Sequence, residues 1–208
     1  AEWERYYCYK EENRHLTREE AADLRAYIDH REYEPAVSRV LSGGAFSIPE
    51  KKLIRKLNTE KKRTVYLFPR EENYVLKLLT FLLLRRYDSL FTDNLYSFRV
   101  SQGVGKALTH ILHTPELRRM YSYKVDVSNY FNSIPVERIL SRVRQIAADD
   151  PKLCDFLEQL LCEPDALLED GRHITEPKGI MAGTPIAAFL ANVYLMDLDA
   201  LFFEKGVL

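Results

Sequence analysis

One acidic residue in this chain stands where an apolar strand is expected to end. Asp126 lies between Val125 and Val127, and the aromatic pair Tyr130–Phe131 follows shortly after. A carboxylate at the end of a strand, backed by a hydrophobic core, can hold a hard cation such as Mg²⁺ against a substrate phosphate. The alternative is an aspartate that caps the short helix beginning after it. The segment therefore predicts either a metal-binding carboxylate or a helix cap.

A run of basic residues provides a second group of side chains that could bind a ligand. Seven basic residues and one acid, Glu60, lie between positions 51 and 63. The basic residues are Lys51, Lys52, Arg55, Lys56, Lys61, Lys62 and Arg63. The formal net charge of the chain is −1, which argues against general nucleic-acid binding. A concentrated basic loop nevertheless suits a phosphate-rich ligand, and the alternative is a solvated surface.

A third segment places two glycines ahead of a helix that is rich in alanine and leucine. Gly179 and Gly183 stand four residues apart, and Pro185 follows them. Glycine lets the backbone approach a ligand closely, and the beginning of a helix favours anions. The alternative use of such a pair is turn formation alone.

The remaining pattern predicts the elements that position these three segments. Thr17–Glu20 is a capping box, which predicts a helix extending to about Tyr33. Asp170-Gly171 lies between short β-prone runs and predicts a hairpin. Periodicity and prolines predict further helices over about 71–91, from 135, after 151 to about 162, and over 185–205, with a strand over 64–68. This mixture indicates an α+β fold, mostly helical with short antiparallel strands and hairpins.

Composition limits the class of protein. The 208 residues are 46% apolar and 29% charged, so the chain can bury a core and is neither disordered nor fibrous. The three cysteines, Cys8, Cys154 and Cys162, lack the spacing of a disulfide framework or a zinc site. The longest apolar run, near 76–84, is shorter than the about 20 residues that cross a bilayer. We therefore expect a cytoplasmic protein that does not enter the membrane.

Four segments, in order, resemble the fingers and palm of reverse transcriptases. The likeness is greatest to the bacterial type of group II introns and of retron- or defence-associated systems. The first segment is the basic hairpin, followed by Phe68-Pro69 and a long helix. The second, Leu95–Arg99, is similar to the family's Ser-Tyr-Gly-Phe-Arg, and the third, Asp126–Ile134, to its first catalytic motif. The fourth, Gly179–Leu195, is similar to Gly-x-Pro-Gln-Gly-x-x-x-Ser-Pro-x-Leu-Ala-Asn-x-x-Leu. The resemblance begins at about Ile48.

This resemblance implies a domain order and an activity. Residues 1–47 would be an N-terminal helical extension, 48–122 the fingers, and 123–208 a partial palm with a helical insertion at 135–162. The implied enzyme is an RNA-directed DNA polymerase that extends a DNA or RNA primer on an RNA template. It would use deoxynucleoside triphosphates and Mg²⁺, or Mn²⁺ in its place. The family's other two catalytic aspartates lie in a hairpin beyond the position of Leu208. We therefore expect a fragment that is truncated before that hairpin and inactive on its own.

The resemblance assigns the centre of the reaction to three positions. Asp126 is the implied catalytic residue and the ligand of both metal ions. The carbonyl oxygen of Val127 is implied as a further metal ligand. Phe131 matches the family's aromatic gate, which excludes a ribose 2′-hydroxyl and so favours deoxynucleotides. A core phenylalanine is the alternative for Phe131.

Four further positions match residues that contact the incoming nucleotide. Lys56 and Arg63 match the fingers residues that clamp the triphosphate, while the choice among Lys61, Lys62 and Arg63 stays open. Ala182 and Gly183 match part of the family's Pro-Gln-Gly, so the glutamine that contacts the sugar is missing. This departure leaves two alternatives to the polymerase: a non-catalytic reverse-transcriptase-like scaffold that binds RNA, and a template-independent DNA polymerase of a defence system.

Overall fold

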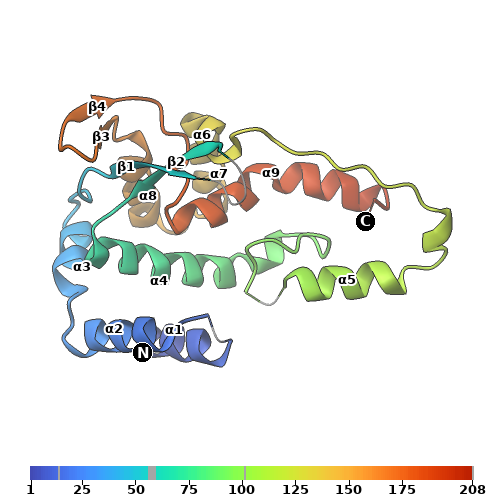
Figure 1. The fold of residues 1–208 in the computed structure, drawn as a ribbon, viewed down its shortest axis with the longest axis horizontal. Coiled ribbons are helices and arrows are strands. Elements are labelled where there is room, and N and C mark those ends of the chain that lie inside the picture. The colour runs from blue at the N-terminus through green and yellow to red at the C-terminus, as the bar shows by residue number, and fades with distance from the viewer. Residues whose placement is uncertain (14, 56–59, 101, 208) are drawn as a thin grey trace.

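The computed structural model describes residues 1–13, 15–55, 60–100 and 102–207. Helices predominate in these residues, and a small mixed sheet lies at one end of the molecule (Figure 1). In chain order the helices are α1 (Glu2–Glu12), α2 (Arg18–Asp29), α3 (Glu34–Leu41), α4 (Arg70–Arg86), α5 (Val104–His113), α6 (Tyr130–Ser133), α7 (Val136–Ile146), α8 (Pro151–Cys162) and α9 (Ile186–Glu204). Two 3₁₀ turns, η1 (Asp88–Leu90) and η2 (Leu117–Arg119), follow α4 and α5. The predicted α+β class is confirmed.

The sheet joins two hairpins that lie far apart in the sequence. Its strands are β1 (Glu50–Arg55), β2 (Lys62–Leu67), β3 (Asp165–Leu167) and β4 (His173–Thr175), in the spatial order β2-β1-β3-β4. Both hairpins are antiparallel, and the predicted turn at Asp170-Gly171 connects β3 to β4. The hairpins meet where Glu50 pairs with Leu167 in parallel orientation. The sequence predicts only antiparallel strands, because local turn signals do not show which distant strands become neighbours.

Local signals in the sequence account for the ends and buried faces of several helices. Thr17 accepts a hydrogen bond from the Glu20 amide, and the Glu20 side chain accepts one from the Thr17 amide, so the predicted capping box begins α2. The helix ends at Asp29, earlier than predicted. In α7 the residues spaced along one face, Ile139, Leu140 and Val143, are buried as the periodicity predicts.

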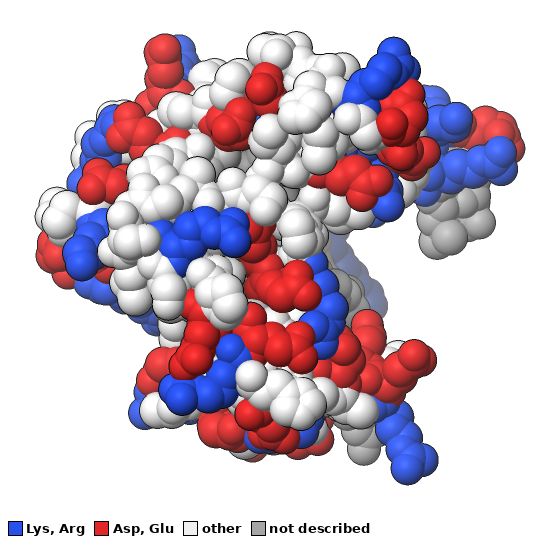
Figure 2. Space-filling model, turned by 90° about the vertical axis from the view of Figure 1, so that its left-hand side faces the viewer, with Lys and Arg blue, Asp and Glu red and all other residues white. Residues whose placement is uncertain are grey.

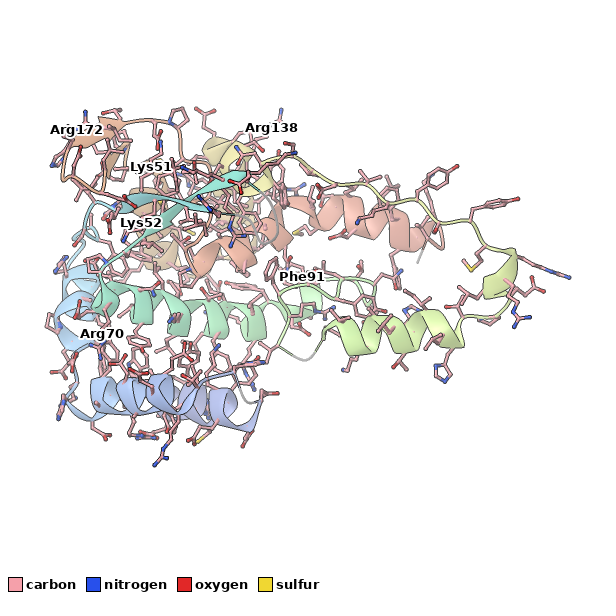
Figure 3. The ribbon with its side chains drawn as sticks, viewed as in Figure 1. Lys51, Lys52, Arg70, Phe91, Arg138 and Arg172 are labelled. Atoms are coloured by element: carbon pink, nitrogen blue, oxygen red, sulfur yellow. The ribbon has the colours of Figure 1, made fainter. Side chains whose placement is uncertain are left out.

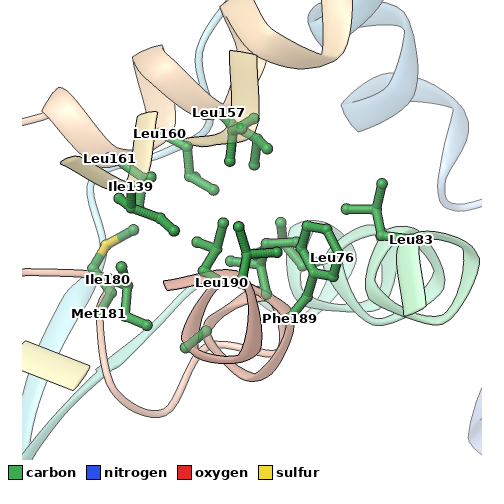
Figure 4. Packing of buried hydrophobic residues seen from close by; sticks show 14 of the residues in the cluster. Leu76, Leu83, Ile139, Leu157, Leu160, Leu161, Ile180, Met181, Phe189 and Leu190 are labelled. Atoms are coloured by element: carbon green, nitrogen blue, oxygen red, sulfur yellow. The ribbon is translucent and has the colours of Figure 1, made fainter. Parts of the chain in front are cut away.

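The main core lies where α4, α7, α8 and α9 meet the segment before α9. Figure 4 shows Ile180 and Met181 packed beside Ile139 of α7, with Leu190 of α9 and Leu76 of α4 nearby. All five of these side chains are almost fully buried. Burying each aliphatic side chain of this size contributes about 1.5–3 kcal/mol. The core therefore fixes the segment carrying the two glycines relative to the helices.

The apolar composition of α9 follows from its place in this core. Among the described residues, α9 alone is long and apolar enough to cross a membrane by length and composition. Its N-terminal half is buried at Ile186, Ala187 and Leu190, and the helix contacts α4 and α7. Because a buried core helix has the same composition, α9 is weak evidence for a membrane span.

The segment carrying Asp126 differs from its prediction. Residues 120–127 run from η2 back towards α6 without regular secondary structure, and they pair with no strand in the described part of the chain (Figure 1). Tyr121, Tyr123 and Val125 are 95%, 94% and 86% exposed. The alternation of apolar and polar residues is typical of a strand, but a strand is stabilised only by a neighbour. The predicted apolar strand backed by a core is therefore wrong in this structure.

Candidate functional site

Asp126 is exposed and lies four residues before α6. The N-cap of α6 is Asn129, so the alternative prediction of Asp126 as the helix cap is also wrong. Within the described residues, neither the Asp126 carboxylate nor the Val127 carbonyl oxygen accepts a hydrogen bond. Four residues of chain span at most about 14 Å, so Asp126 stays near the beginning of α6. Its oxygen atoms are accessible to a ligand there.

Helix α6 holds Phe131 beside other aromatic rings. Phe131 is half-buried, and its ring centroid lies 5.6 Å from that of Tyr130 and 6.1 Å from that of Phe98. Tyr130 is fixed in turn because its hydroxyl donates to the Ala191 carbonyl oxygen of α9 (2.8 Å). Phe131 is therefore neither a fully buried core residue nor a free surface residue. Phe131 packs against the main core, and the residue as a whole is partly exposed.

Gly179 lets the segment before α9 lie directly against the backbone of α6. Its φ is +56°, and a Cβ added there would lie 2.4 Å from the Phe131 carbonyl oxygen and 2.6 Å from the carbonyl carbon of Asn132. The neighbouring Ile180 amide donates to the same Phe131 oxygen (2.9 Å). The sequence predicts a close approach to a ligand at this glycine, whereas the structure shows a close approach to the backbone of α6.

Gly183 makes the matching approach to the β1–β2 hairpin. Its φ is +98°, and an added Cβ would lie 2.7 Å from Cβ of Val65 in β2. The Tyr66 amide donates to the Ala182 carbonyl oxygen (2.8 Å). The segment from Gly179 to Gly183, hereafter the glycine loop, thus lies between α6 and β2.

Asn132 connects all three segments, and the sequence analysis did not identify it. Its Oδ1 accepts a hydrogen bond from the Ala182 amide (3.0 Å), and its Nδ2 donates to the Thr64 carbonyl oxygen (3.3 Å). One side chain of α6 therefore joins the glycine loop to β2. Its position six residues after Asp126 was visible in the sequence, but an asparagine there carries no local signal of this role.

The register of the hairpin decides which basic residues face the glycine loop. Side chains alternate between the two faces of a strand, so Arg63 lies on the same face of β2 as Val65, which contacts Gly183. Lys52 pairs with Val65 across the hairpin and shares that face, whereas Lys51 projects to the opposite side (Figure 3). Lys62 lies on the side away from the loop. Lys56 lies outside the described residues.

On the other face of the hairpin, basic and acidic groups are already paired. Glu176 accepts hydrogen bonds from Lys51 Nζ (2.5 Å) and the Tyr66 hydroxyl (2.7 Å). Burial opposes ionisation of Glu176, but these two donors outweigh it and hold its pKa below the ordinary value. Lys178 is buried, which lowers its pKa, and its Nζ donates to the Asp165 carbonyl oxygen (2.5 Å). These contacts fix the beginning of the glycine loop to the sheet.

The Leu95–Arg99 segment is held by structural contacts. Arg99 is buried and forms a two-pronged ion pair with Asp88, from Nε (2.8 Å) and Nη2 (2.9 Å). Asn192 of α9 is also buried and donates to the Ser97 carbonyl oxygen (3.0 Å). The segment therefore contacts α9 through the Ser97 carbonyl oxygen, and the ring of Phe98 lies beside that of Phe131.

The acidic residues of α9 do not join Asp126 in a metal site. Asp197 is ion-paired with Arg142 of α7, and burial raises the pKa of Asp199. Within the part of the chain that the structure describes, no three His, Cys, Asp or Glu side chains gather as metal ligands. Asp126 therefore belongs to no cluster of metal-ligating side chains among the described residues.

Charge on the surface is mixed. On the face shown in Figure 2, Lys and Arg side chains lie among Asp and Glu side chains without a continuous basic surface. Exposed pairs such as Arg172–Asp170 (2.7 Å) and Lys52–Glu50 (3.2 Å) neutralise several of the cations. Lys62 and Arg63 have no ion-pair partner among the described residues. Arg55 at the end of β1 also lacks an ion-pair partner among these residues, so the free positive charge of the hairpin lies at Arg55, Lys62 and Arg63.

No protein-family model matches the chain, and no curated protein matches it. The interpretation of the site consequently depends on the motifs and on this geometry.

Proposed function

We propose that this chain is the fingers–palm portion of a cytoplasmic RNA-directed DNA polymerase. The observation that carries the proposal is the contact among three motif segments. Asn132 and the glycine loop bring β2, α6 and the beginning of α9 together. The motif resemblance assigns the triphosphate clamp to the hairpin that contains β2 and the sugar gate to α6. It assigns further contacts with the incoming nucleotide to the glycine loop.

In this proposal the described residues bind and orient the incoming nucleotide. Arg63 contacts the triphosphate, because it has no ion-pair partner among the described residues and lies on the face of β2 that meets the glycine loop. Phe131 closes the sugar side of the site, since it is a partly exposed residue of α6 that lies beside Phe98. A 2′-hydroxyl placed against this ring loses its hydrogen bonds with water without a replacement, which disfavours ribonucleotides.

The Asp126 carboxylate and the Val127 carbonyl oxygen would hold Mg²⁺, or Mn²⁺ in its place. Both groups lack hydrogen-bond donors among the described residues, and hard divalent cations prefer oxygen ligands. When bound, the cation stabilises the negative charge that develops during nucleotidyl transfer. An RNA template and a DNA or RNA primer complete the substrate.

Ala182 has a different role from the glutamine of the family motif. Its amide is bonded to Asn132 and its carbonyl oxygen to Tyr66, so its backbone connects α6 to β2. Its side chain offers no hydrogen bond to the sugar. Discrimination against ribonucleotides therefore depends on Phe131 alone in this proposal.

A non-catalytic scaffold that binds RNA is the second candidate. It is favoured by one observation: Asp126 has no companion carboxylates in a metal-binding group among the described residues. A template-independent polymerase is a variant of the first candidate and uses the same nucleotide contacts.

Primer extension with the complete gene product separates these candidates. The wild-type protein is expected to extend a primer on an RNA template with deoxynucleotides and Mg²⁺, and Asp126→Asn to reduce the rate at least about 100-fold. Asp155→Asn, an exposed change on α8, is the matched control and should keep the wild-type rate. Extension without added template supports the template-independent variant. Hybrid binding without any extension supports the scaffold, and extension that survives Asp126→Asn contradicts the site assignment.

A further inference from the structure

A cavity lies between the N-terminal helix and the long helix α4. Its volume is about 240 Å³, and its walls come from α1, His15, α4, residues 98–100 and the beginning of α9. It is smaller than the about 300–1,000 Å³ of pockets for drug-sized ligands. A small aromatic phosphate, no larger than a mononucleotide, is therefore the size of ligand to consider.

Aromatic rings form much of this cavity. Tyr6 and Phe81 are buried, and their ring centroids lie 5.4 Å apart in an edge-to-face arrangement. Tyr9 stacks at a tilt on Phe81 with a centroid distance of 4.9 Å. Phe98 closes another side of the cavity and is half exposed. These rings offer faces and edges to a planar aromatic ligand.

Two lysines line the same cavity and have no acidic partner. Lys10 of α1 and Lys77 of α4 are half-buried, and neither forms an ion pair within the described residues. Burial, followed by the charge of Lys77, lowers the pKa of Lys10, and burial lowers the pKa of Lys77. The two ammonium groups thus repel each other across partly dehydrated space, and a bound anion would relieve this repulsion.

Nearby carboxylates offset part of the positive charge of these lysines, but within the described residues they form no ion pair with them. Glu20 raises the pKa of both lysines and Asp23 raises that of Lys77, while Glu20 accepts hydrogen bonds in the capping box of α2 and Asp23 accepts them from Arg70 and Tyr74. Arg99 also borders the cavity, but it is committed to Asp88. Among the described residues, no carboxylate lines the cavity.

We propose that this cavity binds a phosphorylated aromatic ring, such as a nucleoside monophosphate, with the phosphate between Lys10 and Lys77 and the ring against Tyr9 and Phe98. Two ammonium groups match the near-dianionic charge of a phosphate monoester at neutral pH. Because aromatic rings lie beside the two ammonium groups, the cavity should bind an aromatic phosphate more tightly than inorganic phosphate. The same chemistry occurs in a free mononucleotide and in the 5′-phosphorylated end of a single strand. The site does not depend on the proposed polymerase function, because it requires neither Asp126 nor a divalent cation.

Calorimetric titration of the protein with AMP in the presence of EDTA tests this site separately from the polymerase site. Lys10→Gln and Lys77→Gln are each expected to weaken AMP binding at least about tenfold, because each removes a charge-assisted contact. Lys106→Gln, an exposed change on α5, is the matched control and should leave the affinity unchanged. Thermal melts of all three variants check that they fold.

Two comparisons identify the ligand class. Adenosine and inorganic phosphate should each bind at least about tenfold more weakly than AMP. Tyr9→Leu should narrow the difference in affinity between AMP and inorganic phosphate. A 5′-phosphorylated tetranucleotide that binds more tightly than AMP assigns the site to a strand end, and the reverse order assigns it to a mononucleotide. The proposal is overturned if AMP gives no saturable heat at millimolar concentration, if folded Lys10→Gln and Lys77→Gln bind it as tightly as the wild type, or if phosphate alone matches AMP.

Discussion

Replacement of Gly179 by alanine should be far more damaging than the same change at Gly171. Both glycines have positive φ, +56° and +81°. A Cβ at Gly171 meets nothing within 4 Å, whereas at Gly179 it would lie 2.4 Å from the Phe131 carbonyl oxygen. Because the obstructing atoms belong to the backbone of α6, a rotation of a side chain cannot relieve the overlap.

The structure gives the size of this difference. A left-handed alanine costs about 1–2 kcal/mol, overpacking adds about 1–3 kcal/mol, and loss of the hydrogen bond from Ile180 to Phe131 adds about 0.5–1.5 kcal/mol. The expected loss of unfolding free energy is therefore about 3–6 kcal/mol for Gly179→Ala. For Gly171→Ala the backbone contribution alone remains, about 1–2 kcal/mol.

Urea unfolding followed by circular dichroism and by Trp3 fluorescence measures both losses. With a slope of about 2 kcal/mol per molar, the midpoint should fall by about 1.5–3 M for Gly179→Ala and by about 0.5–1 M for Gly171→Ala. Coincidence of the two probes shows that one cooperative transition is being compared. Equal midpoints for the two variants would refute the close packing of the glycine loop on α6.

Three other predictions follow from the same contacts. Asn132→Ala leaves the Ala182 amide without an acceptor and should lower the free energy of unfolding by about 1–3 kcal/mol, measured by urea unfolding against Asn94→Ala on the surface. Because the pKa of Glu176 is lowered below 4.5, its stabilisation is present above pH 4.5 and is lost as pH falls through the folded-state pKa. The stability difference between wild type and Glu176→Gln should therefore shrink below pH 4.5, and a difference independent of pH would contradict the pairing. Phe131→Val should increase ribonucleotide incorporation by the complete gene product, and an unchanged sugar preference would remove its role as a gate.

Much of the helical architecture could be predicted from local chemistry. The capping box at Thr17, the proline at position 135 and the Asp170-Gly171 turn each act within a few residues, so their outcome depends little on the rest of the chain. The parallel contact between Glu50 and Leu167 joins distant segments and leaves no local signal. It became visible only in the structure.

The candidate site could be predicted only in part, because its contacts also join segments that are distant in the sequence. Arg63, Phe131 and Gly183 lie on segments that the structure brings into contact, while their roles toward a nucleotide stay predictions. The prediction of a strand around Asp126 was wrong. Alternating apolar and polar residues show that a segment can form a strand, but the strand forms only where a neighbouring strand pairs with it. Asn132 was missed because its role depends on carbonyl and amide groups contributed by two other segments.

The most direct test of the central claim is crosslinking of a photoreactive deoxynucleoside triphosphate to the complete gene product bound to a template–primer. Mass spectrometry then identifies the labelled peptides. The account predicts label on peptides that contain Arg63, residues 129–134 and the glycine loop, with loss of all three when unlabelled deoxynucleotide is added. Label confined to other parts of the chain, or label on these peptides that unlabelled deoxynucleotide does not displace, would contradict a nucleotide site built from β2, α6 and the glycine loop.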